Sequence, residues 1–391
     1  MKYSKKLFTF ILTVSALCTV ACSKDKAMKG SEYLQGKDDQ PFFDGYHNIA
    51  GTEEGYYLLG DELISYYDKS SSKIHVLCSK AECMHNNESC NASISTSSIR
   101  FYNDKLYCIE PDKNNAGDYN LCEISKDGSS KNALFVVYHE EGTEKEQLYM
   151  NDFIVHRGYI YYCLSNFNTE PSVYQIVRRK LEKNAKEEIV QKFYFEDMLE
   201  LMEFQGVGDY VYYGIVKKDN TEKYNELYAY DTQKHSTECV LDREMDFKDF
   251  MAEGNKVYYT DKDNLYVKNK MDNTVEKVME LPEKGCFEIS VDEDNFYFDN
   301  YCDLSLKFLN SGKPMQEYEN PETFQDRKVY IYNKENKKQR TVLEIANSDS
   351  FYSGDENIVL LGDEMTEHCG MISILPKQNL GTDSQEWKKI Q

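Results

Sequence analysis

One pattern of residues recurs seven times along this chain and limits the folds open to it. Each copy contains a strand, a tight turn of Gly, Asp or Asn, a strand with aromatic pairs, another such strand, a polar turn and a last strand ending in aliphatic residues. The turn and its aromatic strand lie at residues 54–57, 103–107, 157–162, 208–213, 254–259, 294–298 and 356–360. Four short strands therefore repeat with a period of roughly 40 to 60 residues.

This repeat predicts an all-β fold, a β-propeller of seven four-stranded blades. Strands such as residues 227–230 carry apolar or aromatic side chains on both faces, as expected of a sheet packed between two neighbouring sheets. An unclosed β-solenoid or two packed sandwiches are the alternatives. The degenerate last copy, at 371–375 and 387–390, leaves six or eight blades open. Residues 196–203 are expected to form a short helical turn.

The first residues have the pattern of a secretory signal peptide. Lys2, Lys5 and Lys6 form a positively charged N-terminal region. Residues 7–20 then form an apolar segment that is too short to span a bilayer permanently. The following Ala21-Cys22-Ser23 resembles the lipobox of bacterial lipoproteins, although Thr19 stands where that motif usually has Leu. The resemblance implies cleavage before Cys22 and a lipid on its sulfur. The alternative is an ordinary secretory signal with an incidental cysteine.

The sequence therefore divides into a signal peptide (1–21), a flexible linker beginning at the lipidated Cys22 (22–40) and a propeller domain (41–391). The linker is polar and rich in lysine, and it has too few large apolar residues to form a core. We expect the chain to be lipid-anchored at the cell membrane, with its propeller on the extracytoplasmic face.

The net charge restricts the partners of such a domain. There are 68 Asp and Glu residues against 46 Lys and Arg, a formal charge of -22. This balance excludes nucleic acid, whose phosphates need a basic surface, and opposes close contact with anionic lipid head groups. The expected membrane contact is therefore the N-terminal lipid alone.

Cys78, Cys83, His85 and Cys90 form the densest group of reactive side chains in the sequence. Three thiols and one imidazole can supply the four ligands of a structural zinc site, which would order a loop without a core. The spacing C-x4-C-x-H-x4-C is not that of a standard zinc finger. Disulfides, which are expected outside the cytoplasm, and free thiols are the competing interpretations. The sequence predicts no other cofactor.

Two further pairs of cysteines fall on neighbouring predicted strands. Cys108 and Cys122 lie in one blade, and Cys286 and Cys302 lie near strand ends in another. Both pairs are disulfide candidates. No motif places a base beside any thiol, so the sequence indicates no catalytic cysteine.

The cysteine-rich segment also carries a family resemblance. Residues 55–92, with Leu77-Cys78, the Cys83-x-His85 turn and Cys90-Asn-Ala, resemble uncharacterised β-propeller lipoproteins of clostridial-type bacteria. The other repeats are similar to TolB-like propellers only in style. The resemblance implies a surface lipoprotein, and it supplies no substrate and no catalytic residue.

The long connections between strands indicate where a ligand binds. Residues 111–118, 165–171 and 302–326 join the second and third strands of their blades, and 78–92 joins two blades. All are expected on one face, around the mouth of the central channel, and insertions on one face of a repeat array mark a binding face. The candidate binding residues there are Tyr301, Asp303, Tyr318 and Phe324.

No sequence motif indicates catalysis. The chain lacks a G-x-S-x-G elbow, a P-loop, H-E-x-x-H and G-x-G-x-x-G. The acidic pairs at 261–264 and 292–295 fit tight turns better than a calcium loop. We therefore expect a non-catalytic propeller that binds an envelope protein, a peptide or a glycan. The alternative is an envelope polysaccharide lyase or hydrolase, with Asp303, Glu317 and Glu322 as acidic candidates.

Overall fold

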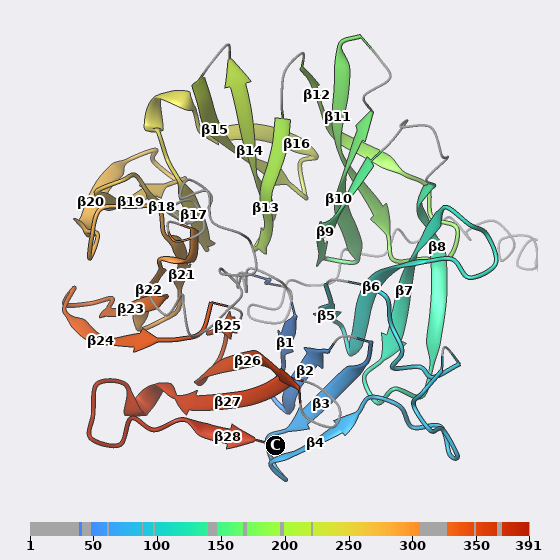
Figure 1. Cartoon of the computed structure of the whole chain (residues 1–391). Coiled ribbons are helices and arrows are strands. Elements are labelled where there is room, and N and C mark those ends of the chain that lie inside the picture. The colour runs from blue at the N-terminus through green and yellow to red at the C-terminus, as the bar shows by residue number, and fades with distance from the viewer. Residues whose placement is uncertain are drawn as a thin grey trace, which may run out of the picture.

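The computed structural model of this chain describes residues 39–40, 48–60, 62–87, 89–96, 98–139, 147–166, 170–195, 199–219, 222–302, 304, 327–347, 349–365 and 370–390. These residues form seven four-stranded antiparallel sheets arranged around a centre (Figure 1). The prediction of an all-β, seven-bladed propeller is confirmed. Among the described residues, no helix has the length and apolar character needed to cross a bilayer.

The first four blades follow one another along the chain. Blade 1 comprises β1 (Ile49–Gly51), β2 (Gly55–Leu59), β3 (Ile64–Asp68) and β4 (Lys73–Val76). Blade 2 comprises β5 (Arg100–Tyr102), β6 (Lys105–Pro111), β7 (Asp118–Ser125) and β8 (Lys131–His139). Blade 3 comprises β9 (Gln147–His156), β10 (Tyr159–Asn166), β11 (Ser172–Lys180) and β12 (Glu188–Phe195). Blade 4 comprises β13 (Leu199–Val207), β14 (Tyr210–Asp219), β15 (Glu222–Asp231) and β16 (Ser236–Leu241).

Three further blades complete the ring. Blade 5 comprises β17 (Asp249–Glu253), β18 (Lys256–Thr260), β19 (Asn264–Asn269) and β20 (Val275–Glu280). Blade 6 comprises β21 (Glu288–Val291), β22 (Asn295–Asp299), β23 (Lys328–Asn333) and β24 (Gln339–Glu344). Blade 7 comprises β25 (Ser350–Tyr352), β26 (Asn357–Met365), β27 (Gly370–Pro376) and β28 (Lys388–Ile390). Two short 3-10 helices, η1 (Arg243–Met245) and η2 (Lys377–Asn379), lie between strands.

Each blade keeps its strands in chain order, which we call A to D, with A nearest the centre (Figure 1). Because successive strands are antiparallel, the A–B and C–D turns lie on one face of the ring, which we call the turn face. The B–C and D–A connections lie on the other, which we call the loop face. This alternation fixes the face on which each side chain near a strand end is found.

The aromatic pairs of the repeat are cross-strand contacts between strands B and C. Tyr57 lies opposite Tyr66 with ring centroids 4.7 Å apart, and Tyr213 lies opposite Tyr228 at 5.7 Å. Such pairs stabilise a sheet beyond the area that they bury. Each of the seven buried apolar clusters combines residues of two adjacent blades. The core of the molecule is therefore the set of seams between blades.

The acidic pairs of the A–B and B–C turns act as the sequence predicts. Asp261 Oδ1 accepts the backbone N–H of Asp263 at 2.7 Å and of Asn264 at 2.6 Å. Asp292 holds the turn between β21 and β22 by equivalent bonds. These carboxylates stabilise local turns, as Asp commonly does, so the turn interpretation accounts for them.

The ring closes without a strand shared between the two ends of the chain. Blade 7 is built wholly from β25–β28 and blade 1 from β1–β4, and they meet through a cluster that includes Tyr56, Tyr67 and Ile374. A second link lies upstream of β1. Gln40 N–H donates to Gly206 O in blade 4 at 2.8 Å, and its Nε2 donates to Phe101 O in blade 2 at 3.0 Å.

The expected helical turn at residues 196–203 is wrong for the part that the structure describes. Residues 199–203 belong to β13, which pairs with β14 from Leu199, opposite Lys217, to Val207, opposite Tyr210. The long partner strand β14 supplies the backbone hydrogen bonds that an isolated helical turn would have to make internally. Tertiary context therefore overrides the local preference.

Candidate functional site

The cysteine-rich segment follows β4, the outermost strand of blade 1. Its end packs back on that blade, where Ile64 N–H donates to Ala92 O at 2.9 Å. It also contacts the C–D turn of blade 2, because Asn91 Nδ2 donates to Gly128 O at 2.9 Å. The segment therefore lies between the outer parts of blades 1 and 2 (Figure 1). The expectation that it surrounds the mouth of the central channel is wrong, because the chain enters it from the outer edge of the sheet.

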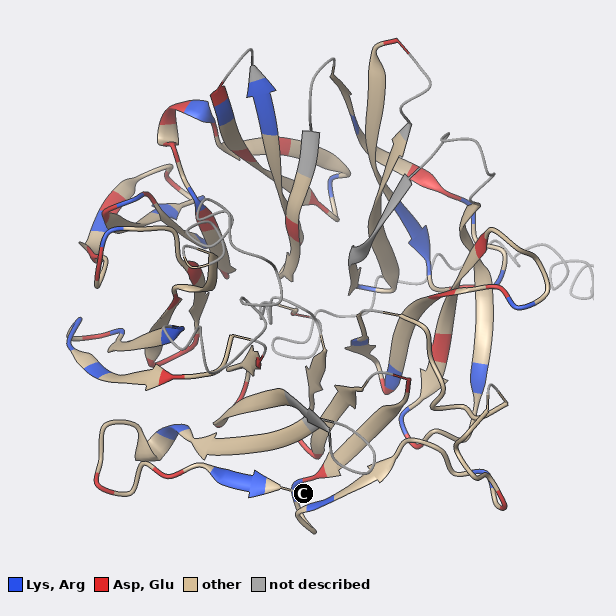
Figure 2. Cartoon of the chain, in the orientation of Figure 1, with Lys and Arg blue, Asp and Glu red and all other residues tan. Residues whose placement is uncertain are grey.

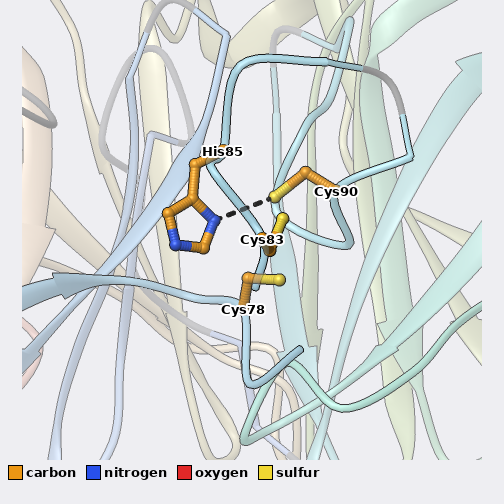
Figure 3. Close-up of side chains that lie close together, drawn as sticks. All are labelled: Cys78, Cys83, His85 and Cys90. Carbon is orange, nitrogen blue, oxygen red and sulfur yellow. Dashed lines mark hydrogen bonds between the residues drawn. The ribbon is translucent and has the colours of Figure 1, made fainter. Parts of the chain in front are cut away.

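The structure brings Cys78, Cys83, His85 and Cys90 together (Figure 3). One sulfur or ring nitrogen from each residue lies within 4.8 Å of those of the others. His85 Nδ1 is 3.4 Å from Cys90 Sγ. Cys90 is buried and the other three are half-buried. These four residues have the composition and proximity needed to hold a metal ion.

Backbone N–H groups face two of these sulfurs. Burial raises the pKa of the Cys78 thiol, but the N–H groups of Lys80 and Asn91 and the neighbouring Cys90 and Cys83 thiols outweigh it and lower the pKa. For Cys90, burial raises the pKa to about 11, although the N–H of Ala92 opposes that shift. The Cys78 sulfur thus carries a negative charge more readily than the Cys90 sulfur does.

The two other predicted cysteine pairs are also neighbours in space. Cys108 and Cys122 lie directly opposite each other on β6 and β7. Cys302 Sγ lies 3.2 Å from Cys286 Sγ, beside the entrance to blade 6. Both pairs therefore have the side-chain proximity that the sequence predicts.

Of the predicted loop-face binding residues, the structure places Tyr301. Its N–H donates to Asp299 Oδ1 at 3.0 Å, and the Arg327 guanidinium lies over its ring, 4.7 Å from the centroid. Asp303, Tyr318 and Phe324 lie outside the described residues, as do Glu317 and Glu322. Tyr301 is half-buried beside a buried ion pair, so its backbone and ring are held in place at this face.

That ion pair was not predicted from the sequence. Arg327 forms a bidentate pair with Asp299, with Nη2 to Oδ2 at 2.7 Å and Nε to Oδ1 at 3.1 Å. Its Nη1 donates to Asp349 O at 2.6 Å and to Asn347 O at 3.2 Å. The Arg327 and Asp299 side chains are only 4% and 8% exposed. The pair therefore connects the end of strand β22 with the start of strand β23, and it also holds the connection that leads into blade 7.

Two carboxyl groups beside this pair have raised pKa values. Glu288 lies opposite Asp299 in the sheet, and burial, followed by the Asp299 charge, raises its pKa to about 8 against the opposing effect of Arg327. Burial also raises the pKa of Asp249 to about 7, although Asp249 Oδ2 accepts the N–H of Ile289 at 2.6 Å. Both residues begin an A strand, at the loop-face end of the channel. No sequence motif marks them.

These pKa values predict a pH-dependent stability. In the unfolded chain both carboxyl groups have their ordinary pKa of about 4, so the folded state binds protons more tightly than the unfolded state does. The free energy of unfolding therefore falls as pH rises from about 4 to 8. The double variant Asp249→Asn/Glu288→Gln is expected to flatten that fall by about 1–3 kcal/mol. Urea unfolding at several pH values measures it. The exposed Glu335→Gln is the control, and an unchanged slope in the double variant would contradict the prediction.

A large cavity opens on the turn face, opposite to the predicted binding face. Its volume is about 1360 Å³. It is lined by the A–B turns of blades 5, 6 and 7, by the C–D turns of blades 6, 7 and 1, and by Asp39. Acidic and basic residues are interspersed on these blades (Figure 2). No sequence pattern marks this cavity, because each turn is short and the cavity forms only when the blades assemble.

Lysines at the start of the C–D turns form ion pairs in the wall of this cavity. Each follows strand C of its own blade and reaches a carboxylate of the preceding blade. The pairs are Lys69 with Asp355 at 2.7 Å, Lys334 with Glu253 at 2.6 Å, and Lys377 with Asp292 at 2.5 Å. The cavity wall is therefore cross-linked from blade to blade by partly buried ion pairs.

These ion pairs keep the wall carboxylates charged. Burial alone raises the pKa of Asp292, but Lys377, the Tyr297 hydroxyl and the N–H of Asp294 outweigh it, so the net pKa lies below its usual range. For Glu356, burial is likewise outweighed, by backbone contacts and by Lys69, and the pKa is lowered. The cavity thus presents ionised groups of both signs at neutral pH.

Comparisons with known proteins agree with this architecture. The oligogalacturonate lyase from Vibrio parahaemolyticus matches with a TM-score of 0.51 at 11% identity, over 85% of this chain and 90% of that one. The tricorn protease matches with a TM-score of 0.50 at 9% identity; this chain is 92% covered and spans 36% of the protease. TolB from Acinetobacter baumannii matches with a TM-score of 0.39 at 13% identity, over 87% and 80%.

At such identities the likeness is one of fold. No family model and no curated protein matches the chain. The protein is a seven-bladed β-propeller. Neighbours of this fold include enzymes and other proteins, so the function has to be argued from the sites.

Proposed function

We propose that this protein is an extracytoplasmic lipoprotein, held at the cell membrane by a lipid on Cys22, whose propeller binds an envelope ligand without transforming it. The signal-peptide pattern and the Ala21-Cys22-Ser23 motif support the anchor. The ligand classes that fit are a peptide, a glycan or another envelope protein. Its acidic charge disfavours nucleic acid.

The turn-face cavity carries the binding proposal. Its volume of about 1360 Å³ is large enough for an oligomeric ligand or a protruding segment of a partner. Its walls come from several blades that are fixed to one another by ion pairs, so the cavity is preformed. A preformed site loses little conformational freedom on binding, which favours affinity.

The chemistry of the wall favours binding over catalysis at this end of the channel. Asp292 and Glu356 have lowered pKa values and stay ionised, so they are poor general acids at neutral pH. Each contacts a lysine that joins two blades. Exposed lining residues such as Glu293 and Gln378 remain for a polar ligand.

One observation favours the second candidate, a polysaccharide lyase or hydrolase. Asp249 and Glu288 have raised pKa values at the loop-face end of the channel, and titratable groups of this kind are common in active sites. Asp249 also accepts the N–H of Ile289 and so links β17 to β21. That structural contact is why we rank binding first.

Capture from envelope extract by the chain lacking residues 1–22 tests the proposal. The variant Glu293→Arg/Gln378→Trp adds two large side chains to the cavity lining and is expected to lower capture of a mass-spectrometrically identified ligand at least about tenfold. Glu276→Arg, on the outermost strand β20, is the control and should capture as the unmodified chain does.

The other outcomes separate the alternatives. Equal capture by the cavity variant would remove the turn face from the proposal. Loss of capture only after deletion of residues 303–326 would place the ligand on the loop face. Degradation of an envelope glycan by the unmodified chain, abolished in Asp249→Asn/Glu288→Gln, would show an enzyme instead.

A further inference from the structure

The cysteine-rich segment between blades 1 and 2 has a complete set of ligands for one metal ion. Cys78, Cys83, His85 and Cys90 each place a donor atom within 4.8 Å of the others. In a tetrahedral zinc site, sulfur ligands lie about 2.3 Å and nitrogen ligands about 2.0–2.1 Å from the ion, so small side-chain shifts close this arrangement around Zn²⁺. Three thiolates and an imidazole are ligands that zinc prefers, and four protein ligands leave no open position.

The surrounding backbone is a second, independent observation. The N–H groups of Lys80 and Asn91 face the Cys78 sulfur, and the N–H of Ala92 faces the Cys90 sulfur. Three thiolates around Zn²⁺ leave a net charge of about −1, which such donors stabilise. The Lys80 ammonium group, which donates to Ser89 O, closes the segment and adds a positive charge nearby.

The backbone also accounts for the short spacing between Cys83 and His85. Glu82 and His85 both adopt left-handed conformations, with φ of 63° and 54°. Such conformations are uncommon for residues other than glycine and turn the chain sharply. Here they bring the Cys83 and His85 side chains to the same group despite the single residue between them.

The segment forms part of the seam between two blades. Leu77, Cys90, Ala92 and Ile94 belong to the same buried cluster as residues of β6 and β7. At the contact with blade 2, Gly128 has φ of +69°, and a Cβ there would lie 2.3 Å from Leu77 O. The segment therefore fits closely against blade 2, although its described residues form no helix or strand of their own between β4 and β5.

We propose that Cys78, Cys83, His85 and Cys90 bind one Zn²⁺ as a closed structural site that fastens blade 1 to blade 2. A disulfide accounts for the cluster less well, because three cysteines leave one thiol unpaired beside the histidine. A closed site of four protein ligands has no place for a substrate, so the ion has no part in binding or turnover at the channel.

Metal analysis of the mature chain, purified from membranes without chelators, tests the site. We expect about one zinc ion per chain, and less than about one-tenth of that in Cys78→Ser and Cys90→Ser. Cys239→Ser, at an exposed cysteine on β16, is the control and should retain zinc. His85→Cys preserves four ligands and should also retain it, whereas His85→Ala should weaken retention on dialysis.

Two further measurements separate a zinc site from a disulfide and from misfolding. Replacing the zinc with cobalt should give the visible absorption spectrum of a tetrahedral thiolate site. That spectrum should change in the His85→Cys variant. Removing the metal should speed hydrogen exchange at residues 77–94 and 126–130 while blade 5 is unaffected. A chain without zinc after reconstitution, or with a disulfide between any two of the three cysteines under metal-replete conditions, would overturn the proposal. If the serine variants do not fold, the comparison of zinc retention in His85→Cys and His85→Ala tests the proposal instead.

Discussion

Replacing Arg327 by leucine is expected to lower the free energy of unfolding by about 3–5 kcal/mol. The guanidinium is 4% exposed and contacts the Asp299 carboxylate and the carbonyls of Asn347 and Asp349. Without it, Asp299 stays buried without its counterion and faces Glu288 across the sheet. Urea unfolding of the mature chain, followed by tyrosine fluorescence, measures the loss.

The surface ion pair of Arg243 and Glu222 provides the matched control. Arg243→Leu removes the same group from a site where the two side chains are 46% and 78% exposed, so the change should stay within about 0.5 kcal/mol. The double variant Asp299→Leu/Arg327→Leu should lose less than the sum of the two single variants. Equal effects of Arg327→Leu and Arg243→Leu would show that the buried pair contributes no more than a surface contact.

Replacing Cys22 by alanine is expected to abolish labelling with palmitate and to release the chain from the membrane fraction. Membrane binding through acyl chains gains about 0.8 kcal/mol for each buried CH₂ group, and two chains give a stable anchor. Metabolic labelling and cell fractionation measure both changes in one experiment.

Cys18 supplies the control for the anchor. It precedes Cys22 in the signal peptide and follows the bulky Leu17, which fits the lipobox poorly. Cys18→Ala should therefore keep the full label. A Cys22→Ala chain that is still labelled would show that the lipobox interpretation is wrong.

The seven blades could be predicted because each blade repeats the same short-range sequence pattern. An Asp, Asn or Gly at the A–B turn and facing aromatic residues on strands B and C are short-range features, as at Tyr213 and Tyr228. The proximity of Cys78 and Cys90 could be predicted for the same reason, since both lie in one short segment.

The sites made by assembly could not be predicted in this way. Asp249, Glu288 and Arg327 lie in three separate stretches of sequence, and each looks like an ordinary charged residue near a strand end. Their burial and altered pKa values arise only when blades 5, 6 and 7 meet. The turn-face cavity has the same origin, because turns of different blades form its wall.

The position of Gln40 has a mechanical consequence. Its backbone is joined to Gly206 and its side chain to Phe101, while Asp39 accepts the N–H of Gly208. Tension applied upstream of Asp39 is therefore delivered to blades 2 and 4 together, across the ring, before it reaches β1. The hydrogen bonds to Phe101, Gly206 and Gly208 must therefore break before the tension reaches the first blade. Because these contacts lie at the turn-face end of the channel, a pull on the segment before Asp39 acts first on that face.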